Sequence, residues 1–156
     1  GNIFDLAFIG SPNLREILGD AVVTNDSTLY LFGSVKENGE NESRLILKKL
    51  VNLRERWTRI ITASGSLEGK AITRGRDGEL IVAANKTFEG DKNILIYFLD
   101  EEGNIIDSRE FGETGDQTVE DILYTQSNLI ILGANGFEEN RMISLIKADQ
   151  QGNIWE

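Results

Sequence analysis

The chain has 156 residues, with 16 basic and 26 acidic side chains, a formal net charge of −10, and neither histidine nor cysteine. These absences exclude serine–histidine and cysteine–histidine catalysis, imidazole metal ligands, disulfide frameworks and thiol nucleophiles. The acidic balance argues against nucleic-acid binding, which depends on phosphate neutralisation by lysine and arginine. No apolar run approaches the ~18 residues of a membrane-spanning helix, so we expect no transmembrane segment.

Taken in chain order, the first expected element is at most one short helical turn over Asn13–Leu18, directly after Pro12. Short apolar runs follow, rich in isoleucine, leucine, valine and aromatic residues, and several alternate with polar residues, which is typical of β-strands. These expected strands include residues 29–33, 45–47, 80–84, 94–99, 121–125, 129–133, 142–147 and, just beginning, 153–155.

Turn-forming residues separate these runs. Asp100–Gly103 and Asp149–Gly152 share the pattern Asp-x-x-Gly. In such a turn the aspartate bonds to the backbone ahead of it, and the glycine accepts the positive φ that ends the turn. The pattern therefore predicts antiparallel strands joined by tight turns.

The chain repeats itself with a period of about 50 residues. Similar segments begin at Leu29, Leu80 and Leu129, and the runs near residues 45, 94 and 143 keep the same spacing. A large apolar residue recurs with this period, and we interpret it as the packing anchor between repeats: Phe4, Trp57, Ile106 and Trp155. We therefore expect one domain over residues 1–156, with repeats of approximately 1–56, 57–105 and 106–156.

Four short antiparallel strands in each repeat are typical of a propeller blade. One blade cannot bury both of its faces alone, whereas stacked blades bury them against each other. The predicted fold is therefore all-β, with three four-stranded antiparallel β-propeller blades in the chain.

The third repeat resembles a known family on the residues Gly115-Asp116, Leu129–Gly133 and Ile143–Trp155. These segments look like the blade repeat of β-propellers in exported bacterial proteins and lipoproteins. The Asp-x-x-Gly-Asn-x-x-Trp pattern at the chain end also resembles the tryptophan-docking motif of quinoprotein-type propellers. The resemblance implies an extracytoplasmic protein (periplasmic, secreted or lipid-anchored). A quinone site requires metal-ligating side chains that the sequence does not assign, so we expect no cofactor and no metal.

Three blades form half of a ring, because propellers have about four to eight blades. One hypothesis is a homodimer, in which two chains pair head-to-tail and close six blades. In that case the N-terminal strand Ile3–Ile9 supplies the outer strand of the partner's last blade. The alternative is that the chain is a structural fragment of a longer propeller.

We expect long polar loops to open on one face of the blades, where binding usually occurs. They comprise residues 34–43, 85–92 and 134–140, together with the inter-blade connections 10–17, 62–69 and 112–119. Acidic residues are frequent there, and we take these as candidate ligand-binding residues: Glu37, Glu40, Glu89, Asp91, Asp116, Glu138 and Glu139. The first functional hypothesis is a non-enzymatic binding or protein-interaction module that uses this long-loop face.

The second functional hypothesis is a propeller that binds or hydrolyses glycans with acidic loop residues. Carboxylate pairs perform acid–base chemistry in glycosidases. The adjacent pairs Glu120-Asp121 and Glu138-Glu139 are poorly arranged for this, because neighbouring strand residues point to opposite faces. We therefore expect no catalytic residues. Neither the protein nor the glycan partner follows from the sequence.

Overall fold

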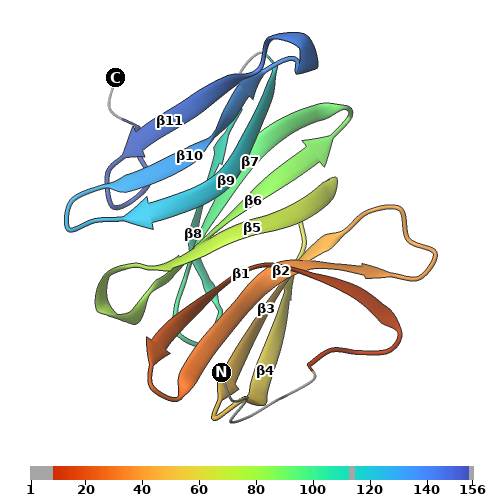
Figure 1. The fold of residues 1–156 in the computed structure, drawn as a ribbon, viewed down its shortest axis with the longest axis vertical. Coiled ribbons are helices and arrows are strands. Elements are labelled where there is room, and N and C mark those ends of the chain that lie inside the picture. The colour runs from red at the N-terminus through yellow and green to blue at the C-terminus, as the bar shows by residue number, and fades with distance from the viewer. Residues whose placement is uncertain (1–8, 113–114, 155–156) are drawn as a thin grey trace, which may run out of the picture.

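The computed structural model describes residues 9–112 and 115–154, and it is all-β. Phe4 and Trp155, two of the expected packing anchors, lie outside these residues. The described chain forms three antiparallel sheets that follow one another along the sequence, and none of them closes into a barrel. Figure 1 shows the three sheets side by side, with the first at the bottom and the third at the top.

The first two sheets each contain four strands that pair in chain order. The strands of the first sheet are β1 (Leu14–Asn25), β2 (Thr28–Glu37), β3 (Arg44–Val51) and β4 (Arg54–Ile61). Those of the second are β5 (Ser66–Arg74), β6 (Leu80–Phe88), β7 (Asp91–Leu99) and β8 (Ile105–Phe111), with a 3-10 turn, η1 (Arg76–Gly78), between β5 and β6.

The third sheet has three strands in the described part of the chain, where the sequence predicted four. They are β9 (Asp116–Tyr124), β10 (Leu129–Gly136) and β11 (Met142–Ala148), with a 3-10 turn, η2 (Glu138–Asn140), before β11. The expected fourth strand contributes one isolated bridge, between Ala148 and Ile154. Among the described residues, the outer edge of β11 therefore has no paired strand along residues 142–147.

The two Asp-x-x-Gly turns have the same geometry. The Asp100 carboxylate accepts hydrogen bonds from the Glu102 and Asn104 backbone N–H groups at 2.9 and 2.8 Å. Asp149 accepts from Gln151 and Asn153 at 2.9 and 2.8 Å. Gly103 and Gly152 end these turns with φ values of 77° and 79°. The same local chemistry therefore returns the chain after β7 and after β11.

Two expectations for the loops are wrong. Residues 14–18 belong to β1 and not to a helical turn, because β1 pairs with β2 from Leu14 onward. One of the expected long loops, 85–92, is mostly strand: β6 and β7 pair as far as Phe88 and Asp91, which leaves a two-residue turn at Glu89-Gly90. The polar composition of residues 85–92 hid these strand ends, since both sides of a hairpin tip that extends into solvent can carry polar side chains.

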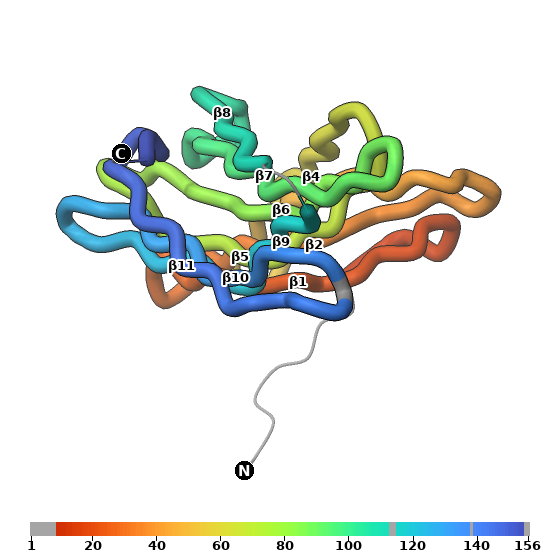
Figure 2. The backbone as a smooth tube through the Cα atoms, turned by 90° about the horizontal axis from the view of Figure 1, so that it is seen from above, coloured from red at the N-terminus to blue at the C-terminus, as the bar shows by residue number. Residues whose placement is uncertain are grey.

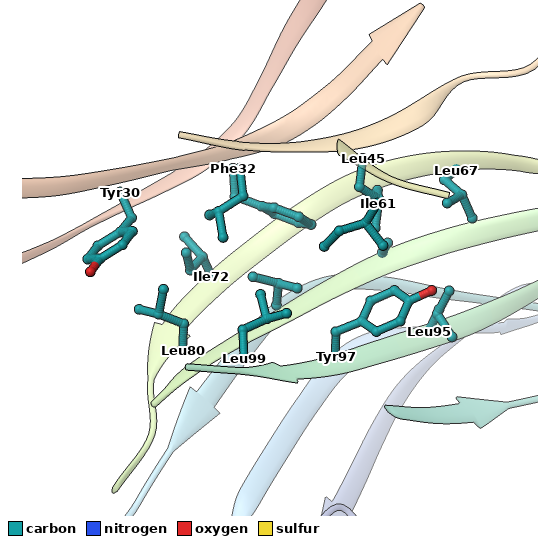
Figure 3. Close-up of a cluster of buried hydrophobic side chains, with 13 residues drawn as sticks. Tyr30, Phe32, Leu45, Ile61, Leu67, Ile72, Leu80, Leu95, Tyr97 and Leu99 are labelled. Carbon is teal, nitrogen blue, oxygen red and sulfur yellow. The ribbon is translucent and has the colours of Figure 1, made fainter. Parts of the chain in front are cut away.

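The sheets stack through two apolar clusters, one in each interface. In the first, residues of β2 and β3 such as Tyr30, Phe32 and Leu47 pack on β5, β6 and β7. Figure 3 shows Tyr30 and Phe32 pointing toward Ile72 and Leu80 of the second sheet. The second cluster lies between the second and third sheets and contains Ala71, Ile81, Ala83, Ile94, Ile96, Phe98, Val119, Ile122, Leu129, Ile131 and Ala148. The second sheet is consequently buried on both faces.

Glycines allow β1 and β2 to approach β5 closely. A Cβ added at Gly69 would lie 2.5 Å from the Gly33 carbonyl oxygen, and one at Gly19 would collide with the Gly69 carbonyl oxygen. Figure 2 shows β1 on one side of the molecule and β4 and β8 together on the other. The first strands of neighbouring sheets therefore lie close together, and the last strands lie along the opposite side.

Neither of the two helical turns in the described residues has the length or apolar character needed to cross a bilayer.

Candidate functional site

Two of the seven candidate acidic residues share one basic partner. Glu37 ends β2 and Glu40 lies in the connection to β3, and both carboxylates contact the Arg44 guanidinium, at 2.6 and 3.3 Å. The bond from Glu37, opposed by partial burial and assisted by Glu40, raises the pKa of Arg44. These two carboxylates therefore stabilise their own hairpin.

Two more candidates belong to the β6–β7 hairpin. Glu89 is in the turn with a left-handed φ of 52°, and Asp91 begins β7. Asp116 begins β9 and pairs with Lys92 at 3.4 Å. Asp116 thus joins the third sheet to the β6–β7 hairpin of the second sheet.

Glu138 and Glu139 form η2 at the tip of the third sheet. Of the adjacent pair Glu120-Asp121, Glu120 forms an ion pair with Lys70 of the second sheet at 2.9 Å. Within the described residues, no group of three or more carboxylates is arranged to hold a metal ion.

Trp57 closes the first sheet–sheet interface, as a packing residue should. Its half-buried ring lies 5.9 Å from the Tyr30 ring, and the Arg59 guanidinium lies 5.0 Å from its centroid. A Cβ added at Gly103 would lie 2.8 Å from the ring, so the 100–104 turn of the second sheet rests on the indole. The Trp57 indole N–H is buried without a hydrogen-bond partner among the described residues.

Ile106 does not occupy the equivalent place in the second interface, because it is 60% exposed. Strand pairing explains the difference. In the first sheet, Trp57 on β4 pairs with Lys49 on β3. In the second sheet, Phe98 on β7 corresponds to Lys49, and its partner on β8 is Asp107. Ile106 is the residue skipped by the β-bulge of β8, just as Arg56 is skipped in β4.

A cleft opens where the second interface has this aspartate in place of a tryptophan. Its volume is about 690 Å³, and it lies between the 3-10 turn η1, the 100–107 segment of the second sheet and the turns of the third sheet. The residues that line it are Arg76, Asp77, Gly78, Glu79, Phe98, Asp100, Glu101, Glu102, Ile106, Asp107, Tyr124, Gln150 and Gln151. We call it the inter-sheet cleft.

The carboxylates of the inter-sheet cleft differ in their partners. Asp100 is bound by Asn104, which lowers the pKa of that carboxyl, and Asp107 is bound by Arg109, which lowers its pKa as well. Glu102 pairs with Lys49 at 3.1 Å. By contrast, the side-chain carboxylates of Glu79 and Glu101 have no ion pair or hydrogen bond among the described residues.

Burial raises the pKa of Glu79, and the neighbouring charge of Asp77 raises it further. Asp77 itself has a left-handed φ of 52° inside η1, a conformation that L-residues with a side chain rarely adopt. The Glu79 carboxylate is thus partly desolvated, and it has no basic partner among the described residues although Arg76 also lines the cleft. A cation in the cleft would therefore relieve the unfavourable field at Glu79.

Aromatic and apolar side chains complete the cleft. Phe98 is 3% exposed and packs in the second cluster, and the half-buried Tyr124 packs against the same cluster. Ile106 adds an exposed aliphatic surface. Carboxylates beside aromatic rings bind cations that carry an apolar stem, since the rings attract charge and the apolar surface covers the stem.

A second hollow, of about 800 Å³, lies along the open edge of β11 and is lined by residues that include Phe111, Leu145, Ile146 and Ile154. Its position follows from the absence of a fourth strand in the described part of the third sheet. We therefore treat it as a strand edge and not as a ligand site.

Sequence reasoning missed Glu79, Glu101 and Tyr124 as site residues. The sequence signal was present, because an aspartate replaces the tryptophan of the first interface. It could be found only after allowing for the turn before β8, which is one residue longer than the turn before β4: Leu99 pairs with Ile105, six residues on, whereas Leu50 pairs with Glu55, five residues on. The sequence matches no protein-family model and no curated protein.

Proposed function

We propose that the chain is a non-enzymatic binding module built of propeller blades, and that its inter-sheet cleft takes a basic side chain of a partner protein. The blade interpretation is supported by three consecutive antiparallel sheets stacked face to face, with glycines where β1 and β2 approach β5. The sequence resemblance to exported propeller proteins supports an extracytoplasmic location.

One observation carries the binding proposal. The first interface is closed by Trp57, whereas the second is open at the equivalent position and exposes unpaired carboxylates beside Phe98 and Tyr124. The acidic residues of the hairpin ends are weaker candidates, because Glu37, Glu40 and Asp116 already have basic partners. We therefore place the binding site in the cleft and not on the loops.

Titration calorimetry with a five-residue peptide that alternates arginine and leucine tests this proposal. Binding is expected to weaken as salt is added, because the rim of the cleft is exposed to solvent. A control peptide with glutamate in place of arginine is expected not to bind, since its charge matches that of the cleft.

Two double variants separate a specific site from the general negative charge. Glu79→Gln with Glu101→Gln removes the two unpaired carboxylates and is expected to weaken binding by about tenfold or more. Glu89→Gln with Asp91→Asn removes the same charge from the β6–β7 turn and is expected to leave the affinity unchanged. Absence of binding, or equal weakening in both variants, would refute the proposal.

A further inference from the structure

Both internal interfaces join their sheets by the same kind of hydrogen bond. In the first, the Asp20 carboxylate of β1 accepts from the Ile72 backbone N–H of β5 at 3.0 Å, and Ser34 accepts from Gly69 at 2.9 Å. In the second, the Asn85 side-chain carbonyl accepts from the Val119 N–H at 2.7 Å. Polar side chains of one sheet thus bind the first strand of the next, close to the β-bulge of that strand.

The third sheet presents the same acceptor on the face that points away from the second sheet. Asp20 follows the bulge of β1 and lies opposite Phe32, and Asp121 follows the bulge of β9 and lies opposite Leu132. In both residues Oδ1 accepts the N–H of the next residue, at 2.7 and 2.8 Å. The Oδ2 atom of Asp20 binds Ile72, whereas Asp121 is exposed and its Oδ2 has no hydrogen bond among the described residues.

Apolar residues surround Asp121 on this face, which we call the free face of the third sheet. The strand registers match Leu45 and Leu47 of β3 with Ile143 and Leu145 of β11. Leu45 and Leu47 are completely buried against the second sheet, whereas Ile143 is 94% exposed and Leu145 is 65% exposed. The face also includes Leu123, Ile130 and Leu132. Apolar surface of this kind marks an interaction site in a soluble protein.

The opposite end of the stack offers the complementary surface. By strand register, Leu29 and Leu31 of β2 match Leu80 and Val82, two residues of β6 that pack on the first sheet. On the same face of the first sheet, Leu18 and Val23 of β1 are 63% and 66% exposed. A hollow of about 290 Å³, lined by Leu18, Leu31 and Ile46 among others, lies beside them. The two ends of the stack therefore repeat the two sides of the internal interfaces.

We propose that the free face of the third sheet docks on the first sheet of a second copy of the chain, so that Asp121 lies beside β1 near Ala21. Ala21 is the register counterpart of Ile72, the residue that Asp20 binds within the chain. Two such head-to-tail contacts related by a two-fold axis close a ring of six sheets. This inference rests on the interpretation of the sheets as blades and is independent of the ligand of the cleft.

Light scattering after size exclusion, over a dilution series of the full chain, tests the inference. The expected mass is twice 17.4 kDa. Leu145→Glu places a charge in the free face and is expected to weaken self-association by at least about tenfold. Asp121→Ala is expected to weaken it as well. Ile105→Glu alters a residue that is 50% exposed on β8, outside both end faces, and is expected to leave the dimer intact.

A folded monomer at every concentration would overturn the inference, as would a mass that grows without limit, because a closed ring has two contacts only. A dimer that survives both Leu145→Glu and Asp121→Ala would also overturn it, since another surface would then hold the copies together. Circular dichroism of each variant establishes that it is folded. Peptide binding to the cleft, measured on the same samples, reports separately on the proposed function.

Discussion

Replacing Trp57 with alanine measures how strongly the first interface is closed. Complete loss of a buried tryptophan costs about 3–5 kcal/mol. Trp57 is half-buried, so its contacts with Tyr30 and Gly103 correspond to the lower part of this range. The substitution also removes a buried indole N–H that has no partner among the described residues, and this offsets the loss of stability by about 1 kcal/mol or more. We therefore expect Trp57→Ala to lower the free energy of unfolding by about 2 kcal/mol.

The matched control is Ile106→Ala. The 49-residue period pairs Ile106 with Trp57, but the bulge leaves Ile106 60% exposed. Its truncation is therefore expected to change the free energy of unfolding by less than about 0.5 kcal/mol. Urea denaturation followed by far-ultraviolet circular dichroism measures both variants under identical conditions.

The difference between the two variants is the quantity that matters. If Ile106→Ala destabilises the chain as much as Trp57→Ala, then Ile106 and not Asp107 lies opposite Phe98, and the inter-sheet cleft is closed by an isoleucine. Trp57→Phe keeps an aromatic ring without the indole N–H, and it is expected to retain most of the stability.

Three further results are expected. Asp107→Trp should fill the inter-sheet cleft and raise the free energy of unfolding by about 1 kcal/mol. It should also abolish binding of the arginine–leucine peptide in calorimetry, and unchanged binding would show that the peptide binds elsewhere. Asn153 lowers the pKa of Asp149, so this carboxylate stabilises the fold above the ordinary carboxyl pKa of about 4, and its contribution is lost as pH falls through the lowered value. Asp149→Ala should therefore make the acid branch of the stability–pH curve shallower, and an unchanged branch would contradict the assignment. Gly69→Ala should destabilise the chain by about 1–3 kcal/mol in urea denaturation, because the new methyl group meets the Gly33 backbone, and a neutral effect would argue against close packing of β5 on the first sheet.

The strands were predictable because their side chains carry the signal directly. Alternating and continuous apolar runs placed residues 80–84, 94–99 and 129–133 correctly within β6, β7 and β10. The Asp-x-x-Gly turns were predictable for the same reason, since Asp100 and Asp149 act through bonds to their own backbone. Local chemistry was therefore sufficient to predict an all-β fold of consecutive antiparallel sheets.

The inter-sheet cleft was not predictable from local chemistry. It depends on one extra residue in the turn between β7 and β8, so that Asp107 takes the place of Trp57 and Ile106 falls on the bulge, where it is exposed. The sequence period conceals such a displacement, because it aligns Ile106 with Trp57. Residues 14–18 were mispredicted for a related reason: pairing with β2 overrides a local helical tendency after Pro12.

The same distinction explains the candidate acidic residues. Sequence alone showed that carboxylates are frequent near the hairpin ends, but it could not show that Glu37 and Glu40 are held by Arg44 or that Asp116 is held by Lys92. Which carboxylates remain unpaired depends on contacts between strands. Glu79 and Glu101 lie in neighbouring turns of the second sheet, and the third sheet completes the cleft that both of them line.

The central claim is that the open second interface is the binding site, and nuclear magnetic resonance tests it most directly. Backbone amide shifts of the isotope-labelled chain are followed during titration with the arginine–leucine peptide. We predict that the shifts that change gather at residues 76–79, 100–107, 124 and 150–151, which surround the cleft. Changes confined to residues 37–40 and 89–91 would contradict the claim, because they would place the peptide on the acidic hairpin ends.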